Sequence, residues 1–142
     1  MEFQNIEKVK NISSIGGGPI GGGWTAFFLS KGYNVKSYLH EPKEKEMFMK
    51  IVKTAWKSLK KLGLTKDASL NNLSVTCDLK KSLEGSHFVQ ESAPEKLELK
   101  QDLYYEMGEI LPKNIIISSS TSGFMMSDIQ KKCNSPVSYT HL

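Results

Sequence analysis

Gly16-Gly17-Gly18-Pro19-Ile20-Gly21 is the stretch that decides the fold, because its first, third and sixth residues are glycines in the spacing G-x-G-x-x-G. A strand-like segment, residues 10–15, comes directly before it, and the apolar pattern of residues 20–31 predicts a helix directly after it. That context is what a dinucleotide-binding turn requires. The three glycines would serve the tight turn, the close approach of the backbone to a pyrophosphate, and the packing of the helix on the strand.

The start of the helix after this turn is the second half of the predicted site. Its free backbone N–H groups and the positive end of its dipole would face the phosphates. A phosphate loop of the Walker A type is excluded, because no Gly-Lys-Ser/Thr closes the run. We therefore expect the cofactor-binding residues of this turn to be Gly16, Gly18, Pro19, Ile20 and Gly21.

A dinucleotide site also needs an acid at the end of the second strand, about 20 residues on, to bind the adenosine ribose. Leu39 stands where that acid is expected, and His40 and Glu41 follow it. Glu41 could accept the ribose hydrogen bonds, whereas His40 would suit a 2′-phosphate. Since the chain has no arginine to bind a phosphate, we favour NAD over NADP, with Glu41 on the ribose.

Strand and helix patterns alternate through the rest of the chain. Strands are predicted at 34–39, 73–76, 87–91 and 114–118, and helices at 44–62, 78–83, 95–111 and 127–132. The apolar face of the helix over 44–62 is expected to consist of Met47, Ile51, Val52, Ala55, Trp56 and Leu59. Alternation of this kind predicts an α/β protein with a Rossmann-type, doubly wound parallel sheet built from right-handed crossovers.

Composition limits the partners of the chain. Its 142 residues suit about one domain, and all 19 basic residues are lysine, which argues against a sequence-specific nucleic-acid reader. Cys77 and Cys133 lie far apart, so we expect no metal site and a reducing compartment. We expect no signal peptide in the charged N-terminus, and no apolar run approaches the ~20 residues of a membrane span. We therefore expect a cytoplasmic protein whose partner is a small-molecule substrate.

Three stretches together make the chain similar to one family. They are residues 16–35 with the glycine turn, residues 88–100 (FVQESAPEKLELK) and residues 117–123 (ISSSTSG). In this order and spacing they resemble the NAD-binding N-terminal domain of the 3-hydroxyacyl-CoA dehydrogenase superfamily. Within it, residues 90–95 and the serine-rich run 118–122 look most like the branch that oxidises carnitine. The gulonate dehydrogenase and lambda-crystallin branch has a similar serine-rich run, so this branch stays open as an alternative.

The resemblance implies roles for three residues. Glu95 and Lys100 match positions that contact the nicotinamide end of NAD, and Ser122 matches the serine whose hydroxyl binds the substrate oxygen near the hydride acceptor. A hydroxyl both donates and accepts, so it would serve an alcohol and a ketone alike. From the residues alone other uses stay open: Glu95 could start a helix, Lys100 could lie on the surface and Ser122 could sit in a turn.

The resemblance also implies an activity and what the chain lacks. The implied reaction is hydride transfer between a carnitine-like 3-hydroxy acid and NAD, with 3-hydroxyacyl-CoA or gulonate as alternative substrates and a homodimer at full length. Family members use a His–Glu pair whose histidine motif would follow Pro136, and His141 lacks every neighbour of that motif. We therefore expect a truncated NAD-binding domain over residues 1–136, a non-native tail over residues 137–142, no C-terminal helical domain and no turnover. A nucleotide-binding module without chemistry and a structural protein are the competing hypotheses.

Overall fold

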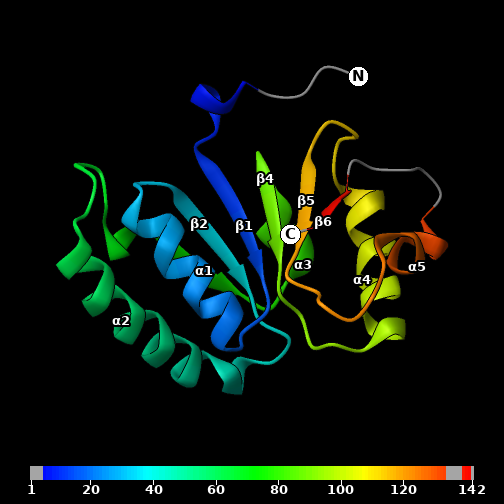
Figure 1. The fold of residues 1–142 in the computed structure, drawn as a ribbon, viewed down its shortest axis with the longest axis horizontal. Helices are drawn as coiled ribbons and strands as arrows, with labels where there is room; N and C mark the ends of the chain where they lie inside the picture. Colours follow the sequence, from blue (N-terminus) through cyan, green and yellow to red (C-terminus); the bar gives the residue numbers. More distant parts are fainter. Residues whose placement is uncertain (1–4, 134–138, 142) are drawn as a thin grey trace.

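A computed structural model describes residues 5–133 and 139–141 of the chain as alternating strands and helices (Figure 1). The strands are β1 (Asn11–Ile15), β2 (Asn34–Tyr38), β3 (Leu73–Thr76), β4 (Phe88–Glu91), β5 (Ile116–Ser119) and β6 (Tyr139–His141). The helices are α1 (Pro19–Ser30), α2 (Lys45–Leu62), α3 (Leu79–Leu83), α4 (Leu97–Ile110) and α5 (Met126–Ile129), with 3-10 turns at Ile6–Lys8, Pro42–Glu44, Leu70–Asn72 and Gln130–Lys132. Every strand and helix predicted from the sequence is present, with its ends shifted by a few residues at most.

The described strands form one parallel sheet in the order β3-β2-β1-β4-β5-β6. The chain runs outward from β1 to β3, crosses back to β4 on the other side of β1, and continues outward to β6. In such sheets ligands bind beyond the carboxyl ends of the strands, where the strand order reverses. The order confirms the predicted doubly wound fold and puts that switch point between β1 and β4.

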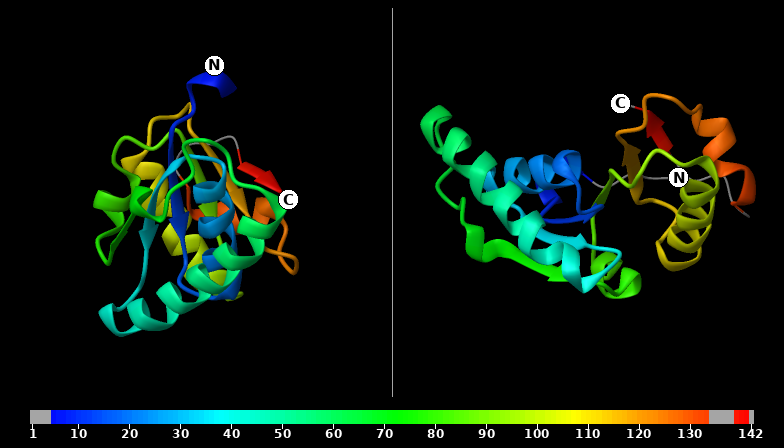
Figure 2. Two further views of the ribbon diagram at one scale, coloured as in Figure 1. Left: turned by 90° about the vertical axis from the view of Figure 1, so that its left-hand side faces the viewer. Right: turned by 90° about the horizontal axis from the view of Figure 1, so that it is seen from below.

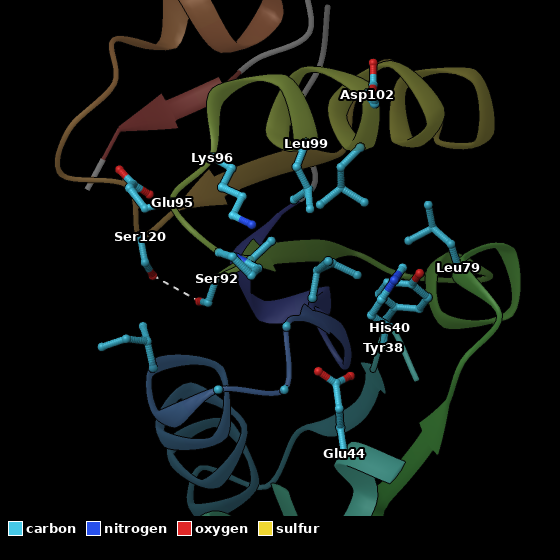
Figure 3. A pocket seen from close by; sticks show the side chains of 18 of the residues that line it. Tyr38, His40, Glu44, Leu79, Ser92, Glu95, Lys96, Leu99, Asp102 and Ser120 are labelled. Atoms are coloured by element: carbon cyan, nitrogen blue, oxygen red, sulfur yellow. Dashed lines mark hydrogen bonds between the residues drawn. The ribbon is translucent and has the colours of Figure 1, made fainter. Parts of the chain in front are cut away.

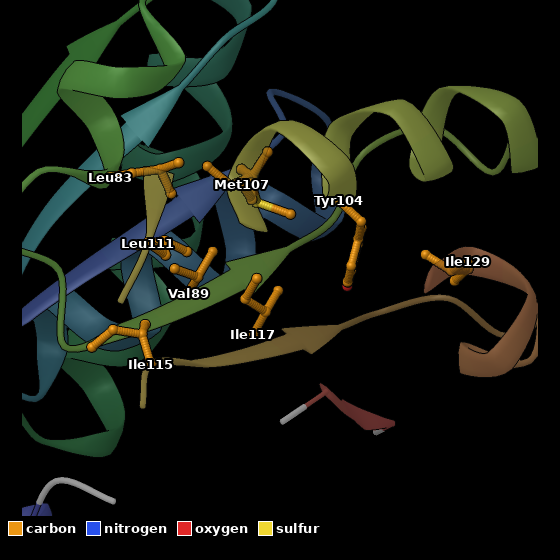
Figure 4. Close-up of a cluster of buried hydrophobic side chains, with 9 residues drawn as sticks. Leu83, Val89, Tyr104, Met107, Leu111, Ile115, Ile117 and Ile129 are labelled. Carbon is orange, nitrogen blue, oxygen red and sulfur yellow. The ribbon is translucent and has the colours of Figure 1, made fainter. Parts of the chain in front are cut away.

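The sheet separates two apolar cores, because successive side chains of a strand point to opposite faces. One core contains Ile15, Leu83, Val89, Tyr104, Met107, Leu111, Ile115, Ile117 and Ile129 (Figure 4). The other contains Ile12, Ala26, Phe28, Leu29, Val35, Leu39, Phe48 and Val52. Helices therefore cover both faces, with α1 and α2 on one side and α3 and α4 on the other (Figure 2).

The long helix α2 packs directly on α1. A Cβ on Gly22 of α1 would stand 2.5 Å from a methyl carbon of Ile51, so a residue larger than glycine would push the two helices apart. Phe48 and Val52 are the fully buried residues of α2. The expectation for Met47 was wrong: it is 61% exposed, because Phe48 takes the place that faces the core. No helix within the described ranges has both the length and the apolar character that a membrane span needs.

Strand β6 falls within the segment expected to be a non-native tail. Its residues pair in parallel with Ile117–Ser119 of β5, which puts His141 opposite Ser119 in the register. The sequence patterns predicted no strand there. Residues 137, 138 and 142 of the expected tail lie outside the described residues, and the domain boundary at 136 stays a prediction.

Candidate cofactor and substrate site

A cavity of about 1070 Å³ opens at the switch point of the sheet. Its size is at the upper end of the roughly 300–1,000 Å³ of small-molecule pockets, which suits an extended ligand. Residues 16–20 of the glycine turn line its middle. Tyr38, His40 and Glu44 line one end, which we call the Tyr38 end, and Ser92, Glu95, Ser120 and Ser122 line the other, the Glu95 end (Figure 3).

The three glycines of the motif meet different demands. Gly16 has a φ of +121°, which favours glycine, and a Cβ on it would stand 2.5 Å from the carbonyl oxygen of Ser92. A Cβ on Gly21 would stand 2.1 Å from the carbonyl oxygen of Gly16, so α1 can begin against β1 only with glycine there. No described atom lies within 4 Å of the Cβ position of Gly18, which lines the cavity. The chain itself needs the first and third glycines, while the space at the second is open to the cavity.

The first turn of α1 presents backbone N–H groups to the cavity. Gly18 precedes the helix, and within the described part of the chain no side chain caps this turn. Pro19 occupies the first helical position, where its missing N–H costs nothing. Ile20, which is 59% exposed, lines the cavity next to it. Uncapped N–H groups at a helix start favour an anion such as a phosphate group.

The Tyr38 end departs from the expected ribose site. Leu39 is fully buried, and its Cδ2 lies 2.9 Å from the Cβ position of Gly17, so it packs against the turn. The Lys43 ammonium lies 2.5 Å from the Glu41 carboxylate and lowers the pKa of Glu41. Glu41 is not among the described residues that line the cavity, whereas the exposed His40 is.

Glu44 is an acid at this end that the sequence analysis missed. Its Oε2 lies 3.7 Å from the Cβ position of Gly17 and accepts a hydrogen bond of 3.0 Å from the backbone N–H of Glu41. Burial first, and then several negative groups including the carboxylates of Glu106 and Glu44, raise the pKa of Tyr38. The spacing Glu41-x-x-Glu44 could have revealed the acid, because a capping box turns its second acid back toward the start of the turn.

A buried ion pair underlies the Glu95 end. Lys100 of α4 is 1% exposed, and its ammonium lies 2.7 Å from the carboxylate of Glu91, which is 0% exposed. The ammonium also donates to the carbonyl oxygen of Ala93 at 3.0 Å, and Glu91 accepts from the hydroxyl of Ser119 and the N–H of Ala93, both at 2.6 Å. Buried charges need such partners. Lys100 is therefore no surface lysine, and Glu91, its buried partner, was not predicted as a site residue.

Glu95 joins the loops that follow β4 and β5. Its Oε1 accepts hydrogen bonds from the Thr121 hydroxyl and from the N–H groups of Ser122 at 3.2 Å and Gly123 at 3.0 Å. The Lys100 ammonium lies 3.4 Å from Oε2. Partial burial favours a higher pKa for Glu95, but the hydrogen bonds and the Lys100 charge outweigh it and lower that pKa. The structure thus brings together the residues that the resemblance singled out: Glu95, Lys100 and Ser122.

The serine run after Ile117 divides between the sheet and the cavity. Ser118 and Ser119 are buried within β5. Ser120 lines the cavity at the Glu95 end, and Ser122 stands exposed on the next loop, also lining the cavity. Ser120 and Ser122 are therefore the members of the run that a ligand in the cavity can reach.

Comparisons with known proteins agree on one family. Residues 11–142 match the family described as 3-hydroxyacyl-CoA dehydrogenase, NAD binding domain. An L-carnitine dehydrogenase of Streptomyces coelicolor is 42% identical over 130 residues, which are 92% of this chain and 41% of that protein. An L-carnitine dehydrogenase of Pseudomonas putida is 34% identical over 131 residues, with the same shares. The chain therefore spans less than half the length of these relatives.

Solved structures share the fold. A 5-formyl-3-hydroxy-2-methylpyridine 4-carboxylic acid 5-dehydrogenase, an NAD+-dependent dismutase, superposes with a TM-score of 0.84 at 25% identity over 94% of this chain and 43% of its own. The 3-hydroxybutyryl-CoA dehydrogenase of Escherichia coli reaches 0.82 at 23% identity over 94% and 29%. Because the family match covers nearly the whole chain, this chain belongs to the NAD-binding domain family of the 3-hydroxyacyl-CoA dehydrogenases.

Proposed function

We propose that the chain is the NAD-binding part of a dehydrogenase that transfers a hydride between a 3-hydroxy acid and NAD. The observation that carries the proposal is one cavity that receives both the uncapped start of α1 and the loop of Ser122 tied to Glu95. A phosphate-binding helix start beside a hydroxyl held by an acid is what a dinucleotide and an alcohol substrate would need together. Membership of the family and the names of the relatives support the same conclusion.

The residues of the cavity fit a dinucleotide. The space at Gly18 would take the pyrophosphate, against the N–H groups of the first turn of α1. Glu44, instead of the expected Glu41, would accept the hydrogen bonds of the adenosine ribose, since Glu44 lines the cavity beside Gly17. A 2′-phosphate would meet this carboxylate and no arginine, so NAD suits the Tyr38 end better than NADP.

When bound at the Glu95 end, the nicotinamide would supply the hydride chemistry. The role of the chain would be to orient the reactants. The hydroxyl of Ser122 would hold the substrate oxygen, accepting from an alcohol and donating to a ketone. Glu95, whose lowered pKa keeps the carboxylate ionised to a lower pH, would hold the loop of Ser122 in place. Lys100 is 1% exposed, so we propose that it positions Glu95 and Glu91 without contacting the nicotinamide itself.

For the substrate we propose a carnitine-like 3-hydroxy acid, because relatives at 34% and 42% identity are L-carnitine dehydrogenases. A 3-hydroxyacyl thioester is the second candidate, because it is the substrate class in the name of the matching family. For the full-length protein we propose a homodimer.

We further propose that the chain alone binds NAD without turning over a substrate. We propose that neither of the two histidines whose side chains the structure describes acts on a substrate held by Ser122. His40 lies at the Tyr38 end, away from Ser120 and Glu95 (Figure 3). His87 directly precedes β4 and so lies at the amino end of that strand, whereas the cavity lies at the carboxyl ends of the strands. Its Nδ1 accepts from the backbone N–H of Lys10 at 2.9 Å.

Calorimetric titration of the purified chain with NADH and NADPH tests the proposal. We expect saturable binding of NADH, at least tenfold tighter than that of NADPH, and no formation of NADH from NAD and L-carnitine. A folded chain that binds neither nucleotide would contradict the proposal. Equal affinity for both nucleotides would contradict only the role given to Glu44. Turnover of carnitine would show that the chain carries a proton acceptor of its own.

A further inference from the structure

Ser120 is the centre of a hydrogen-bond group at the Glu95 end. Its hydroxyl oxygen accepts from the indole N–H of Trp24 at 3.2 Å and from the side-chain amide of Gln90 at 2.9 Å. The hydroxyl oxygen of Ser92 lies 3.1 Å from it, and this bond faces the cavity (Figure 3). Since these partners come from α1, β4 and the loop after β4, three parts of the fold hold the Ser120 hydroxyl in place.

The direction of each hydrogen bond follows from counting donors. The indole N–H of Trp24 can only donate. The Gln90 amide nitrogen also donates, because it lies 3.3 Å from the carbonyl oxygen of Glu91, and the flipped amide would put two oxygens face to face. Both lone pairs of the Ser120 oxygen are therefore occupied, so its one proton goes to Ser92. Ser92 accepts that bond and must direct its own proton elsewhere.

The cavity is where the proton of Ser92 can go. Ser92 lines the cavity, and its hydroxyl makes no other hydrogen bond within the described part of the chain. It stands between the glycine turn and Glu95, since its carbonyl oxygen lies 2.5 Å from the Cβ position of Gly16. If the proposed function holds, this stretch lies between the pyrophosphate and the nicotinamide. The group of a dinucleotide that joins those two is a ribose.

We propose that the Ser92 hydroxyl is a donor of fixed direction to an oxygen of the ribose that carries the nicotinamide. Trp24, Gln90 and Ser120 are the residues that fix its direction. The inference rests on the proposed function, because the ribose lies there only if a dinucleotide occupies the cavity as described. A carbonyl, ether or hydroxyl oxygen is a suitable partner, whereas a donor-only group at that point would be repelled.

Three ligands that differ by one group each test the inference on Ser92→Ala. ADP lacks the ribose, ADP-ribose carries it without nicotinamide, and NADH carries both. We expect Ser92→Ala to weaken ADP-ribose and NADH equally, by roughly three- to tenfold, and to leave ADP unchanged, as for the loss of one neutral hydrogen bond. Calorimetry measures all three affinities. Ser58→Ala, at an exposed serine of α2, is the matched control and should change none of them.

The other patterns each overturn the inference. Weaker binding of NADH alone would place Ser92 on the nicotinamide, and equal weakening of all three ligands would show that Ser92 only shapes the cavity. No change with any ligand would show that the hydroxyl touches none of them. Ser92→Cys, which keeps the size and a weak donor, should fall between the wild-type chain and Ser92→Ala. If the wild-type chain binds neither ADP nor NADH, the proposed function itself fails.

Discussion

At the Glu95 end of the cavity, an ion pair between Lys100 and Glu91 is enclosed at 1% and 0% exposure, and hydrogen bonds tie it to the neighbouring loops. At the Tyr38 end, a single half-buried acid, Glu44, reaches the glycine turn from a short 3-10 turn. Many coupled contacts hold the Glu95 end, and few hold the Tyr38 end. Changes at the Glu95 end should therefore alter folding, while changes at the Tyr38 end should alter binding and leave folding intact.

Lys100→Met should have the largest effect on the free energy of unfolding. It leaves the Glu91 carboxylate buried without its partner, which costs about 3–5 kcal/mol. The double variant Lys100→Met/Glu91→Gln should recover part of this loss, because it removes the unpaired charge. Urea unfolding followed by circular dichroism measures both. If Lys100→Met lowers the free energy of unfolding by less than about 1 kcal/mol, the Glu95 end does not stabilise the fold more than the Tyr38 end does.

Two alanine variants of the glycine turn separate folding from binding. Gly16→Ala adds a Cβ at 2.5 Å from a carbonyl oxygen with φ at +121°, which should destabilise the chain by about 2–4 kcal/mol. Gly18→Ala meets no described atom within 4 Å, and its φ of −78° suits alanine, so stability should change by less than about 1 kcal/mol. Its NADH affinity should nevertheless fall at least tenfold. Thermal unfolding measures stability, and NADH titration measures binding. A loss of stability in Gly18→Ala would show that Gly18, like Gly16, is needed for folding.

Glu44→Gln tests the Tyr38 end. Losing the charge on a ribose acceptor should weaken NADH binding roughly tenfold and narrow the preference over NADPH. Stability should change by less than about 1 kcal/mol, because glutamine keeps an oxygen that can accept from the N–H of Glu41. Glu41→Gln is the control, because Glu41 pairs with Lys43 and does not line the cavity among the described residues. Parallel titrations of both variants with NADH and NADPH show whether Glu44 or Glu41 binds the adenosine ribose. Weaker NADH binding in Glu41→Gln alone would show that Glu41 is the ribose acceptor.

Glu95→Gln should have the smallest effect, visible in the pH dependence of stability. The folded chain lowers the pKa of Glu95, so its stabilising contribution is present above the ordinary pKa and is lost as the pH falls through the folded value. The side chain is 42% exposed, so solvent screening keeps the contribution to at most about 1 kcal/mol. Urea midpoints between about pH 3 and pH 7 should fall less steeply in Glu95→Gln than in the wild-type chain. If the urea midpoints of the two chains fall equally steeply with pH, Glu95 does not contribute to the pH dependence of stability.

The strands, helices and glycine turn could be predicted from the sequence because their signals are local. Alternation of strand and helix patterns implies the parallel sheet, and the spacing of Gly16, Gly18 and Gly21 implies the turn. Met47 shows the limit of such signals, since helical spacing alone did not decide whether Met47 or Phe48 would face the core.

The contacts between elements could not be predicted in the same way. The hydrogen bond between Trp24 and Ser120 joins residues 96 positions apart. Burial of Lys100 depends on how α4 packs against β4, and a lysine in a helix carries no sign of that packing. Resemblance to a family singled out Lys100, and its contact with the cofactor stays a prediction, whereas its enclosure by Glu91 required the structure.

The hydrogen bonds of Glu95 have a consequence for how the mouth of the cavity moves. Ser122 and Gly123 lie on an exposed loop, yet their amide protons are held by one carboxylate from a different loop. Neither loop can swing outward without breaking several of these bonds together, so the two loops behave as one mechanical unit. Their amide protons should exchange with deuterium slowly for so exposed a position, and both should begin to exchange together when the unit opens.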